Sequence, residues 1–259
     1  MGLLIMKLTV IKVGGAVVED PQQLAQLLKD FAAIEGPKVL VHGGGRRATK
    51  VAERLGIETK MVNGRRITEK DMLEVVTMVY GGLVNKNIVA GLQALGVNAI
   101  GLTGADGNVL KAHKRPVVDV DYGFVGDVDK GNLDTLSILL RAGIIPVMAP
   151  LTHDGEGNLL NTNADTIAAE TAKTLARTYD VTLIYAFEKP GVLSDPDDDN
   201  SVISLITSNS YKKLKEEGIV SGGMLPKIDN AYNAIKAGVK EVIITKADAI
   251  DGEHGTKII

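Results

Sequence analysis

Two lysines stand beside pairs of glycines in this 259-residue chain, and both arrangements suit the binding of an anion. Lys12 ends an apolar run just before Gly14 and Gly15, and Lys227 follows the pair 222–223 and opens a helical pattern with Pro226 near its first position. Glycines let backbone N–H groups approach a ligand closely, and a nearby lysine adds a full charge. The helix dipole disfavours a lysine in a first turn unless an anion offsets it. Each lysine alone is also compatible with a solvated side chain.

The order of these residues excludes the common phosphate loop, because its pattern G-x-x-x-x-G-K-[ST] needs a Gly-Lys dipeptide and the chain contains none. A third glycine turn, HGGG at 42–45, opens the helical pattern RRATKVAERLG, and such a helix start suits a carboxylate or phosphate. The esterase interpretation of HGGG would also need a G-x-S-x-G elbow, which is absent.

A dinucleotide fold is an alternative for the same turn. Gly43, Gly45 and Ala48 match the spacing G-x-G-x-x-A, which would suit a Rossmann-type dehydrogenase. That fingerprint expects an acidic residue about 20 positions further on. The chain instead has IETKMVNGRRIT there, with arginines, so the match is weak.

Two polar clusters complete the candidate chemistry. The turn NGRRIT at 63–68 carries Arg65 and Arg66, and a guanidinium fork suits bidentate capture of a carboxylate. The cluster NTNADT at 161–166 opens a helix, where Asn161 or Asn163 can serve as the cap and Asp165 is favourable in the first turn. Capping alone would explain this second cluster, so its chemical role stays open at this level.

Short β-branched runs alternate with longer helical patterns, which predicts βαβ units and a mostly parallel sheet covered by helices. The predicted strands are LTVIKV, KVLVH, NAIGL, IIPVMA, VTLIYA and EVIIT. Glycine turns after such strands lie where α/β proteins bind ligands, at the carboxyl ends of strands. We expect inserted hairpins at 103–130, a turn-rich passage at 153–162, a helix from about Asn163 that crosses between two lobes, and a solvated loop at DPDDDN, 195–200.

Composition narrows the class of protein. A net charge of −3 and a pI near 5.9 give no basic footprint for a nucleic acid. The chain has no cysteine, and its four histidines lack zinc-site spacing, so we expect no protein metal site. MGLLIMK does not read as a signal peptide, and no apolar run approaches the roughly 18 residues of a membrane span. These features predict a cytoplasmic protein with no nucleic-acid or membrane partner.

Taken in order, the clusters resemble the amino acid kinase family, in particular its branch that acts on N-acetylglutamate. The resemblance runs from about residue 8 to the carboxyl end. It rests on KVGG, VHGGG, NGRRIT followed by LEVV, NTNAD, EKPGVL, SGGMLPK and HGTKII. Seven such motifs in sequence are specific, whereas one alone would be weak.

The resemblance implies a three-layer αβα sandwich around a central, mostly parallel sheet, with hairpin insertions in the N-terminal half. Residues 1–165 would form a lobe for acyl-amino-acid binding and dimerisation, and residues 166–259 a lobe for nucleotide binding. The implied reaction is ATP-dependent phosphorylation of the side-chain carboxylate of N-acetyl-L-glutamate, or of a closely related N-acylglutamate, in arginine biosynthesis. Mg²⁺ would accompany ATP, and the protein would be a homodimer.

Roles follow position by position. Lys12 and Lys227 would stabilise the transferring phosphoryl group, Asp165 would hold them in place, and Gly14 and Gly15 would line the phosphates. The acylated amino acid would be bound by Gly44, Gly45, Asn161 and Arg66, with Arg66 on its α-carboxylate. The nucleotide would contact Glu188, Lys189, Gly191, Val192, Leu193, Ile219, Val220, Ser221, Gly222 and Gly223.

Several departures from the family pattern matter. Many members have Pro or a small residue after HGGG, whereas this chain has Arg46 and Arg47. These arginines are either solvated or favour an acyl group that itself ends in a carboxylate, such as succinyl. The segment FEKPG replaces the family's common Asp-containing version. The family's arginine-inhibited members carry an extra amino-terminal helix before the first strand, and here Lys12 already ends that strand. We therefore expect no feedback inhibition by arginine and a dimer rather than a ring of dimers.

Two other functions remain compatible with the same motifs. One is a sister kinase for aminoadipate or glutamate on an amino-group carrier protein, which the arginines at 46, 47, 65 and 66 would help to dock. The other is a non-catalytic ligand sensor, which would not need to keep both lysines and Asp165.

Overall fold

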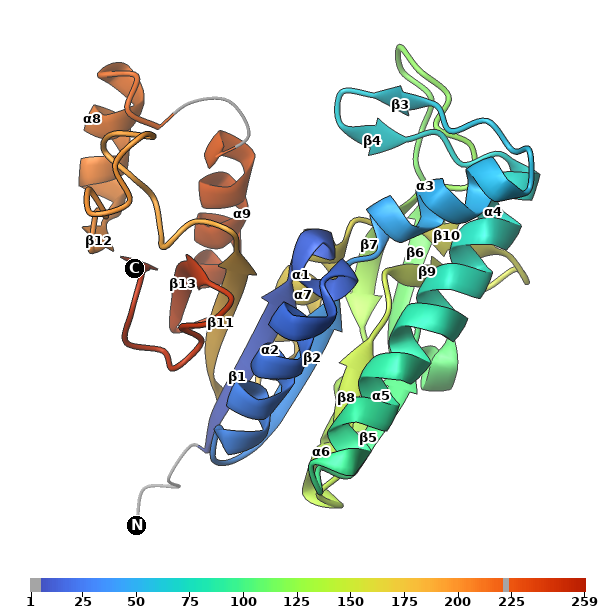
Figure 1. Ribbon diagram of the computed structural model, residues 1–259, viewed down its shortest axis with the longest axis horizontal. Helices are drawn as coiled ribbons and strands as arrows, with labels where there is room; N and C mark the ends of the chain where they lie inside the picture. The colour runs from blue at the N-terminus through green and yellow to red at the C-terminus, as the bar shows by residue number, and fades with distance from the viewer. Residues whose placement is uncertain (1–5, 221–223) are drawn as a thin grey trace.

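All six predicted strand runs lie in one large central sheet of the computed structural model, which describes residues 6–220 and 224–259 (Figure 1). Within the described residues this sheet has eight strands, in the order β12-β14-β13-β11-β1-β2-β8-β5. They are β1 (Lys7–Val13), β2 (Lys38–His42), β5 (Ala99–Leu102), β8 (Ile145–Met148), β11 (Asp180–Phe187), β12 (Leu205–Ile206), β13 (Glu241–Lys246) and β14 (Thr256–Ile258). Neighbouring strands are parallel except β13 and β14, so the predicted mostly parallel sheet is confirmed.

Helices cover both faces of the sheet, because alternate residues of its strands point into two separate apolar cores. In β1, Leu8 and Val10 face one core, and Ile11 and Val13 face the other. The second core packs against α2 (Pro21–Ala33), α3 (Gly45–Arg54), α4 (Lys70–Val76), η1 (Thr77–Val84) and α5 (Asn85–Ala94). The first packs against α6 (Leu133–Arg141), α7 (Ala164–Leu175), α8 (Ser208–Glu216) and α9 (Met224–Lys236). The three-layer αβα sandwich is therefore confirmed.

The inserted hairpins expected in the first half form a smaller sheet in the order β10-β9-β6-β7, with the single turn η2 (Asp106–Asn108) before it. Its strands are β6 (Leu110–Lys114), β7 (Gly126–Gly131), β9 (Leu151–His153) and β10 (Leu159–Asn161). A separate hairpin, β3 (Met61–Val62) and β4 (Arg65–Arg66), projects near α3 (Figure 1). Asn63 and Gly64 connect its strands with φ of 50° and 74°, the left-handed values that a two-residue hairpin turn requires.

Two helices begin next to the lysine-bearing glycine turns. After the first turn, α2 begins at Pro21 and is capped by Asp20, whose side chain accepts from the backbone N–H groups of Gln22 and Gln23. A short helix, α1 (Gly15–Glu19), precedes it, so the glycine turn already opens a helix. At the other end of the chain α9 begins at Met224, two residues before Pro226.

The segments α4, η1 and α5 form one continuous helix, Lys70–Ala94, whose length and mean hydropathy of 1.3 over its most apolar window meet the criteria for a membrane span. From the sequence we expected no apolar run near the length of a membrane span, so this long helix was not predicted. The evidence for a span is weak, because 44% of that window is buried and a core helix passes the same test. Val75, Val79 and Ile88 of this helix lie in the core beneath the sheet.

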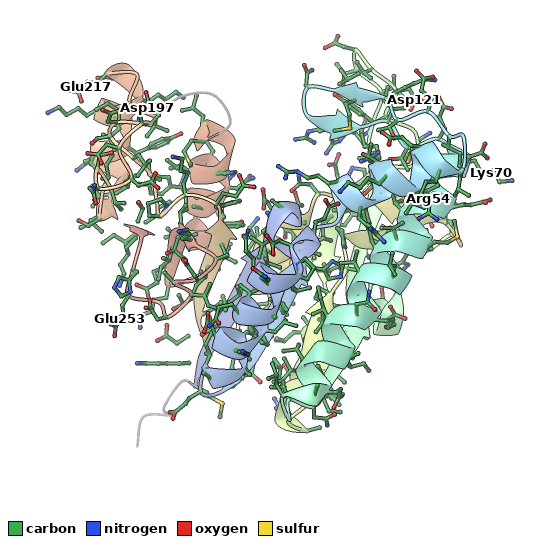
Figure 2. The ribbon with its side chains drawn as sticks, in the orientation of Figure 1. Arg54, Lys70, Asp121, Asp197, Glu217 and Glu253 are labelled. Atoms are coloured by element: carbon green, nitrogen blue, oxygen red, sulfur yellow. The ribbon has the colours of Figure 1, made fainter. Side chains whose placement is uncertain are left out.

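Charged side chains concentrate on the outer surface. Arg54, Lys70 and Glu217 lie at the periphery in Figure 2, as does Asp197. Residues 195–200 are all exposed, as expected for a solvated loop.

Candidate functional site

A cavity of about 550 Å³ opens at the carboxyl ends of β1, β2 and β11. It draws residues from distant parts of the chain, including Gly15, Gly44, Arg66, Phe187 and Lys227. This is the edge at which parallel sheets bind ligands. The three glycine turns and both polar clusters predicted from the sequence meet here, apart from the residues of the third turn at 221–223, which lie outside the described residues.

Lys12 and Asp165 form an ion pair beside this cavity: neither side chain lines it, but the neighbouring residues Gly14 and Ala164 do. Lys12 Nζ lies 2.7 Å from Asp165 Oδ1, and the two side chains are 9% and 20% exposed. Asp165 stands in the first turn of α7, where Asn163 caps the helix by accepting from the backbone N–H groups of Asp165 and Thr166. The capping interpretation of Asn163 is thus correct, and the same cap fixes the carboxylate that faces Lys12.

Lys227 and Lys12 both lie near the aromatic ring of Phe187, the last residue of β11. Lys227 Nζ lies 3.6 Å from the ring centroid and Lys12 Nζ lies 4.8 Å from it. Aromatic faces attract cations, so the ring holds two like charges near each other. Tyr185 stacks against Phe187 and its hydroxyl donates to the backbone oxygen of Asp165 at 3.3 Å. Phe187 is not among the residues predicted for the site, because it reads as one more apolar residue at the end of a strand.

Burial lowers the pKa of Lys227 below its ordinary value of 10.5, with the attraction of Asp165 opposing this and the charge of Lys12 adding to it. If the cationic form acts in the reaction, kcat/KM of the free protein falls as pH rises through this lowered pKa. We expect the alkaline limb of kcat/KM to have its midpoint below pH 10.5. Bound polyphosphate favours the cation, so the limb of kcat should lie at higher pH.

A pH profile of the Lys227→Arg variant checks this assignment. Its guanidinium stays protonated over the accessible range, so the limb should disappear or move upward. A limb at the same pH in both proteins would mean that another group titrates.

The first two glycine turns pack directly on one another. A Cβ on Gly43 would lie 3.1 Å from Gly15 N, and one on Gly44 would lie 2.9 Å from Cδ1 of Tyr80. Gly45 begins α3, so the first N–H groups of that helix are directed at the cavity wall that these turns form. The lack of side chains is therefore a packing requirement and leaves backbone donors available to an anion.

His42 makes a hydrogen bond to the second glycine turn, at Gly43. It is fully buried, and burial lowers its pKa to about 4, so the ring is neutral near pH 7. Lys86 Nζ donates to Asn85 Oδ1, which leaves Asn85 Nδ2 facing His42 Nε2 at 3.1 Å. Nε2 therefore accepts, and His42 Nδ1 donates to the oxygen of Gly43 at 2.7 Å. This bond fixes the orientation of the peptide that joins Gly43 to Gly44.

Arg66 is buried at the other end of the cavity without a carboxylate partner among the described residues. Its Nη2 donates to Gly45 O and to Thr49 Oγ1, each at 2.9 Å, and Nη1 donates to Thr59 Oγ1 at 3.2 Å. All of these acceptors are neutral, so the buried charge remains uncompensated. Such a group favours an anionic ligand.

Asn161 lies near Arg66 and also lines the cavity, and its Nδ2 donates to Thr68 Oγ1 at 2.9 Å. Arg115, which the sequence analysis did not select, lines the same wall and forms an ion pair with Asp127. No local motif marks Arg115, because only the pairing of β6 with β7 brings it to the cavity.

Residues predicted for the nucleotide divide into two groups. Glu188, Lys189 and Gly191 line the cavity, and Glu188 lies 3.7 Å from Arg46. The others that the structure describes are absent from the cavity wall, and they are Val192 and Val220, which lie in the core, Leu193 and Ile219. Ser221, Gly222 and Gly223 lie outside the described residues.

Comparison with known proteins gives a consistent result. The model of the amino acid kinase family matches residues 7–246. A relative from Phocaeicola vulgatus named acetylglutamate kinase is 66% identical over 97% of this chain and 98% of its own. One of the same name from Methanopyrus kandleri is 42% identical over 95% of this chain and 98% of its own. A solved structure of a Streptococcus mutans protein has a TM-score of 0.77 at 32% identity, with 97% and 98% of the chains covered.

Proposed function

The chain belongs to the amino acid kinase family, and from this premise we propose that it phosphorylates the side-chain carboxylate of an N-acylated glutamate with ATP. N-Acetyl-L-glutamate is the acceptor that its relatives' names indicate, and the product would be an acyl phosphate for arginine biosynthesis. The observation that carries the proposal is the convergence of Lys12 and Lys227 on one ring, with Asp165 paired to Lys12. The family match removes the dehydrogenase interpretation of the second glycine turn.

The reaction explains why so many cationic side chains line the cavity, and it needs no catalytic base. A glutamate side chain has a pKa near 4.3, so the acceptor is already an anion at neutral pH. The barrier comes from bringing this anion to an anionic triphosphate, and phosphoryl transfer is catalysed mainly by positioning and positive charge. The two lysines would neutralise charge on the transferring group. Asp165 would orient Lys12 and offset part of the charge of both lysines while the cavity is empty.

The acceptor would be oriented by the opposite end of the cavity. Arg66 would bind its α-carboxylate, because this buried guanidinium has only neutral protein partners among the described residues. Asn161 and the N–H groups of Gly44 and Gly45 would hold the rest of the acylated amino acid. Gly14 and Gly15 would line the phosphates between the two ends.

The divalent metal of such a kinase would arrive with the nucleotide. Among the described residues no three His, Cys, Asp or Glu side chains come together as a cage, and Asp165 is already paired with Lys12. Mg²⁺ is commonly held by phosphate oxygens with few protein ligands, so these residues are compatible with a metal carried by ATP. When bound, it would neutralise charge on the phosphates.

We further propose that residues 166–259 form the nucleotide lobe and residues 1–165 the lobe for the acceptor and for dimerisation. Three of the predicted nucleotide residues, Glu188, Lys189 and Gly191, line the cavity on that side. A homodimer in the cytoplasm is the state proposed.

An acyl-phosphate assay tests the proposed function. The protein, ATP and Mg²⁺ are incubated with hydroxylamine, which traps an acyl phosphate as a hydroxamate. Free glutamate, N-acetylglutamate and carrier-linked acceptors are supplied in turn. We expect hydroxamate with N-acetylglutamate and none with free glutamate. Product with carrier-linked acceptors alone would favour the sister kinase, and no product with any acceptor would favour the ligand sensor.

A further inference from the structure

The cavity is lined by four arginines, at positions 46, 65, 66 and 115. N-Acetylglutamate brings two carboxylates, of which one would go to Arg66 and the other to Lys12 and the glycine turns. Arg46 lies 3.7 Å from Glu188, which is the acidic side chain among the described residues that line the cavity. Arg65 and Arg115 therefore remain without a ligand carboxylate.

Arg115 lies along the wall that an acyl group would face. Its backbone N–H donates to Val125 O at 2.8 Å, and Val125 pairs in turn with Asn161. Since neighbouring strands lie about 4.8 Å apart, Arg115 stands roughly 10 Å across the small sheet from Asn161. All three residues line the cavity. The acyl group leaves the same α-carbon as the α-carboxylate and diverges from the side chain that leads to Lys12, so it extends along this wall.

Asp127 and Tyr122 fix the position of the Arg115 guanidinium in the cavity wall. Asp127 accepts from both Nε and Nη2, with Nε 3.0 Å from Oδ2, and the ring of Tyr122 lies 5.6 Å from Cζ. Nη1 has no hydrogen-bond partner in the part of the chain that the structure describes. The Arg115 side chain is 20% exposed. The hydrogen bond from Arg115 lowers the pKa of Asp127 most, burial opposes it, and the charges of Arg115, His113 and Arg65 lower it further. Arg115 and Arg65 therefore both act on this one carboxylate.

We propose that the acyl subsite accepts, besides acetyl, an N-acyl group that ends in a carboxylate, as in N-succinylglutamate, and that Arg115 binds this third carboxylate. The inference rests on the proposed function, because it names an acceptor class of the same reaction. A succinyl group places its carboxylate carbon about 2.5 Å beyond the acetyl methyl position. The residues involved differ from those that the sequence suggested, since Arg47 does not line the cavity and Arg46 faces Glu188.

The test compares two acceptors of equal size, N-succinylglutamate and its terminal amide, N-succinamoylglutamate, in the hydroxylamine assay. The measured quantity is the ratio of their kcat/KM values, with N-acetylglutamate as the reference acceptor. A charge-assisted hydrogen bond predicts a ratio of roughly 10 to 150 in the wild-type protein. Arg115→Met should bring the ratio to about 1 to 3, and Arg115→Lys should give an intermediate value. Arg47→Gln is the matched control, exposed and outside the cavity wall, and should keep the wild-type ratio.

The outcomes separate this inference from the function on which it rests. A wild-type ratio of about 2 or less, with N-acetylglutamate turned over, overturns the inference and leaves the proposed function intact. A high ratio that persists in Arg115→Met overturns the role of Arg115. If Arg115→Met does not fold, the wild-type and Arg115→Lys ratios decide. Loss of product with every acceptor contradicts the proposed function itself.

Discussion

Replacing Lys227 by alanine should lower kcat by roughly 100- to 1,000-fold, the usual cost of removing one preorganised group that stabilises developing charge. Lys227 Nζ lies 3.6 Å from the centroid of the Phe187 ring, on the side of the cavity where the phosphates would lie. It makes no contact with the acceptor end, so the KM for N-acetylglutamate should change by less than about threefold. Steady-state kinetics with each substrate varied in turn measures both values.

Lys236→Ala is the matched control for this prediction. Lys236 lies exposed in the last turn of the same helix, α9, and does not line the cavity. Its removal should leave the rate within about twofold, as for surface changes away from a site. An unchanged kcat in Lys227→Ala would remove Lys227 from the chemistry.

Replacing Arg66 by methionine should have the opposite kinetic signature. Truncating one partner of a buried charge interaction costs about 3 kcal/mol, which corresponds to a KM for the acceptor raised roughly 100-fold. The effect on kcat should be much smaller, because the α-carboxylate is remote from the transferring phosphoryl group. Arg66→Lys should be intermediate, since it keeps the charge but loses the fork that donates to Gly45 O and Thr49 Oγ1.

The α-amide of N-acetylglutamate, which lacks the α-carboxylate charge, tests whether Arg66 acts by binding that carboxylate. The wild-type protein should discriminate strongly between N-acetylglutamate and its α-amide, and Arg66→Met should discriminate weakly. Equal losses for both acceptors would show that Arg66 acts only through the fold, and a thermal melt of the variant would then show a lowered Tm. The two variants together therefore test the two ends of the cavity independently.

Much of the fold follows from local pattern, because strands buried on both faces read as short apolar runs. The runs around Lys12 and before His42 identified β1 and β2, and glycine turns after them identified the binding edge. The continuous helix Lys70–Ala94 did not follow, since its middle turn Thr77–Val84 is a π-helix that packs Tyr80 against Gly44. Such a distortion depends on tertiary contact and has no signature in the sequence.

The same distinction applies to the site. Lys12, Asp165 and Arg66 carry motifs of their own; Arg66 lines the cavity, and the ion pair of Lys12 with Asp165 lies beside the lining residues Gly14 and Ala164. Phe187 and Arg115 carry none. Phe187 is one more apolar residue at the end of a strand, and Arg115 lines the same cavity as Asn161 only because Val125 pairs between them. Side chains placed by non-local pairing are therefore the ones that sequence patterns omit.

The Phe187 ring also influences how the nucleotide reaches the protein. An aromatic face attracts Lys227 but carries no net charge, and the more distant carboxylates of Asp165 and Glu188 offset only part of the charge of that lysine. An incoming polyphosphate then breaks no ion pair at Lys227 among the described residues, and the remaining positive field draws it in by long-range attraction. Association of ATP should therefore be accelerated at low ionic strength and slowed as added salt shortens the range of this attraction.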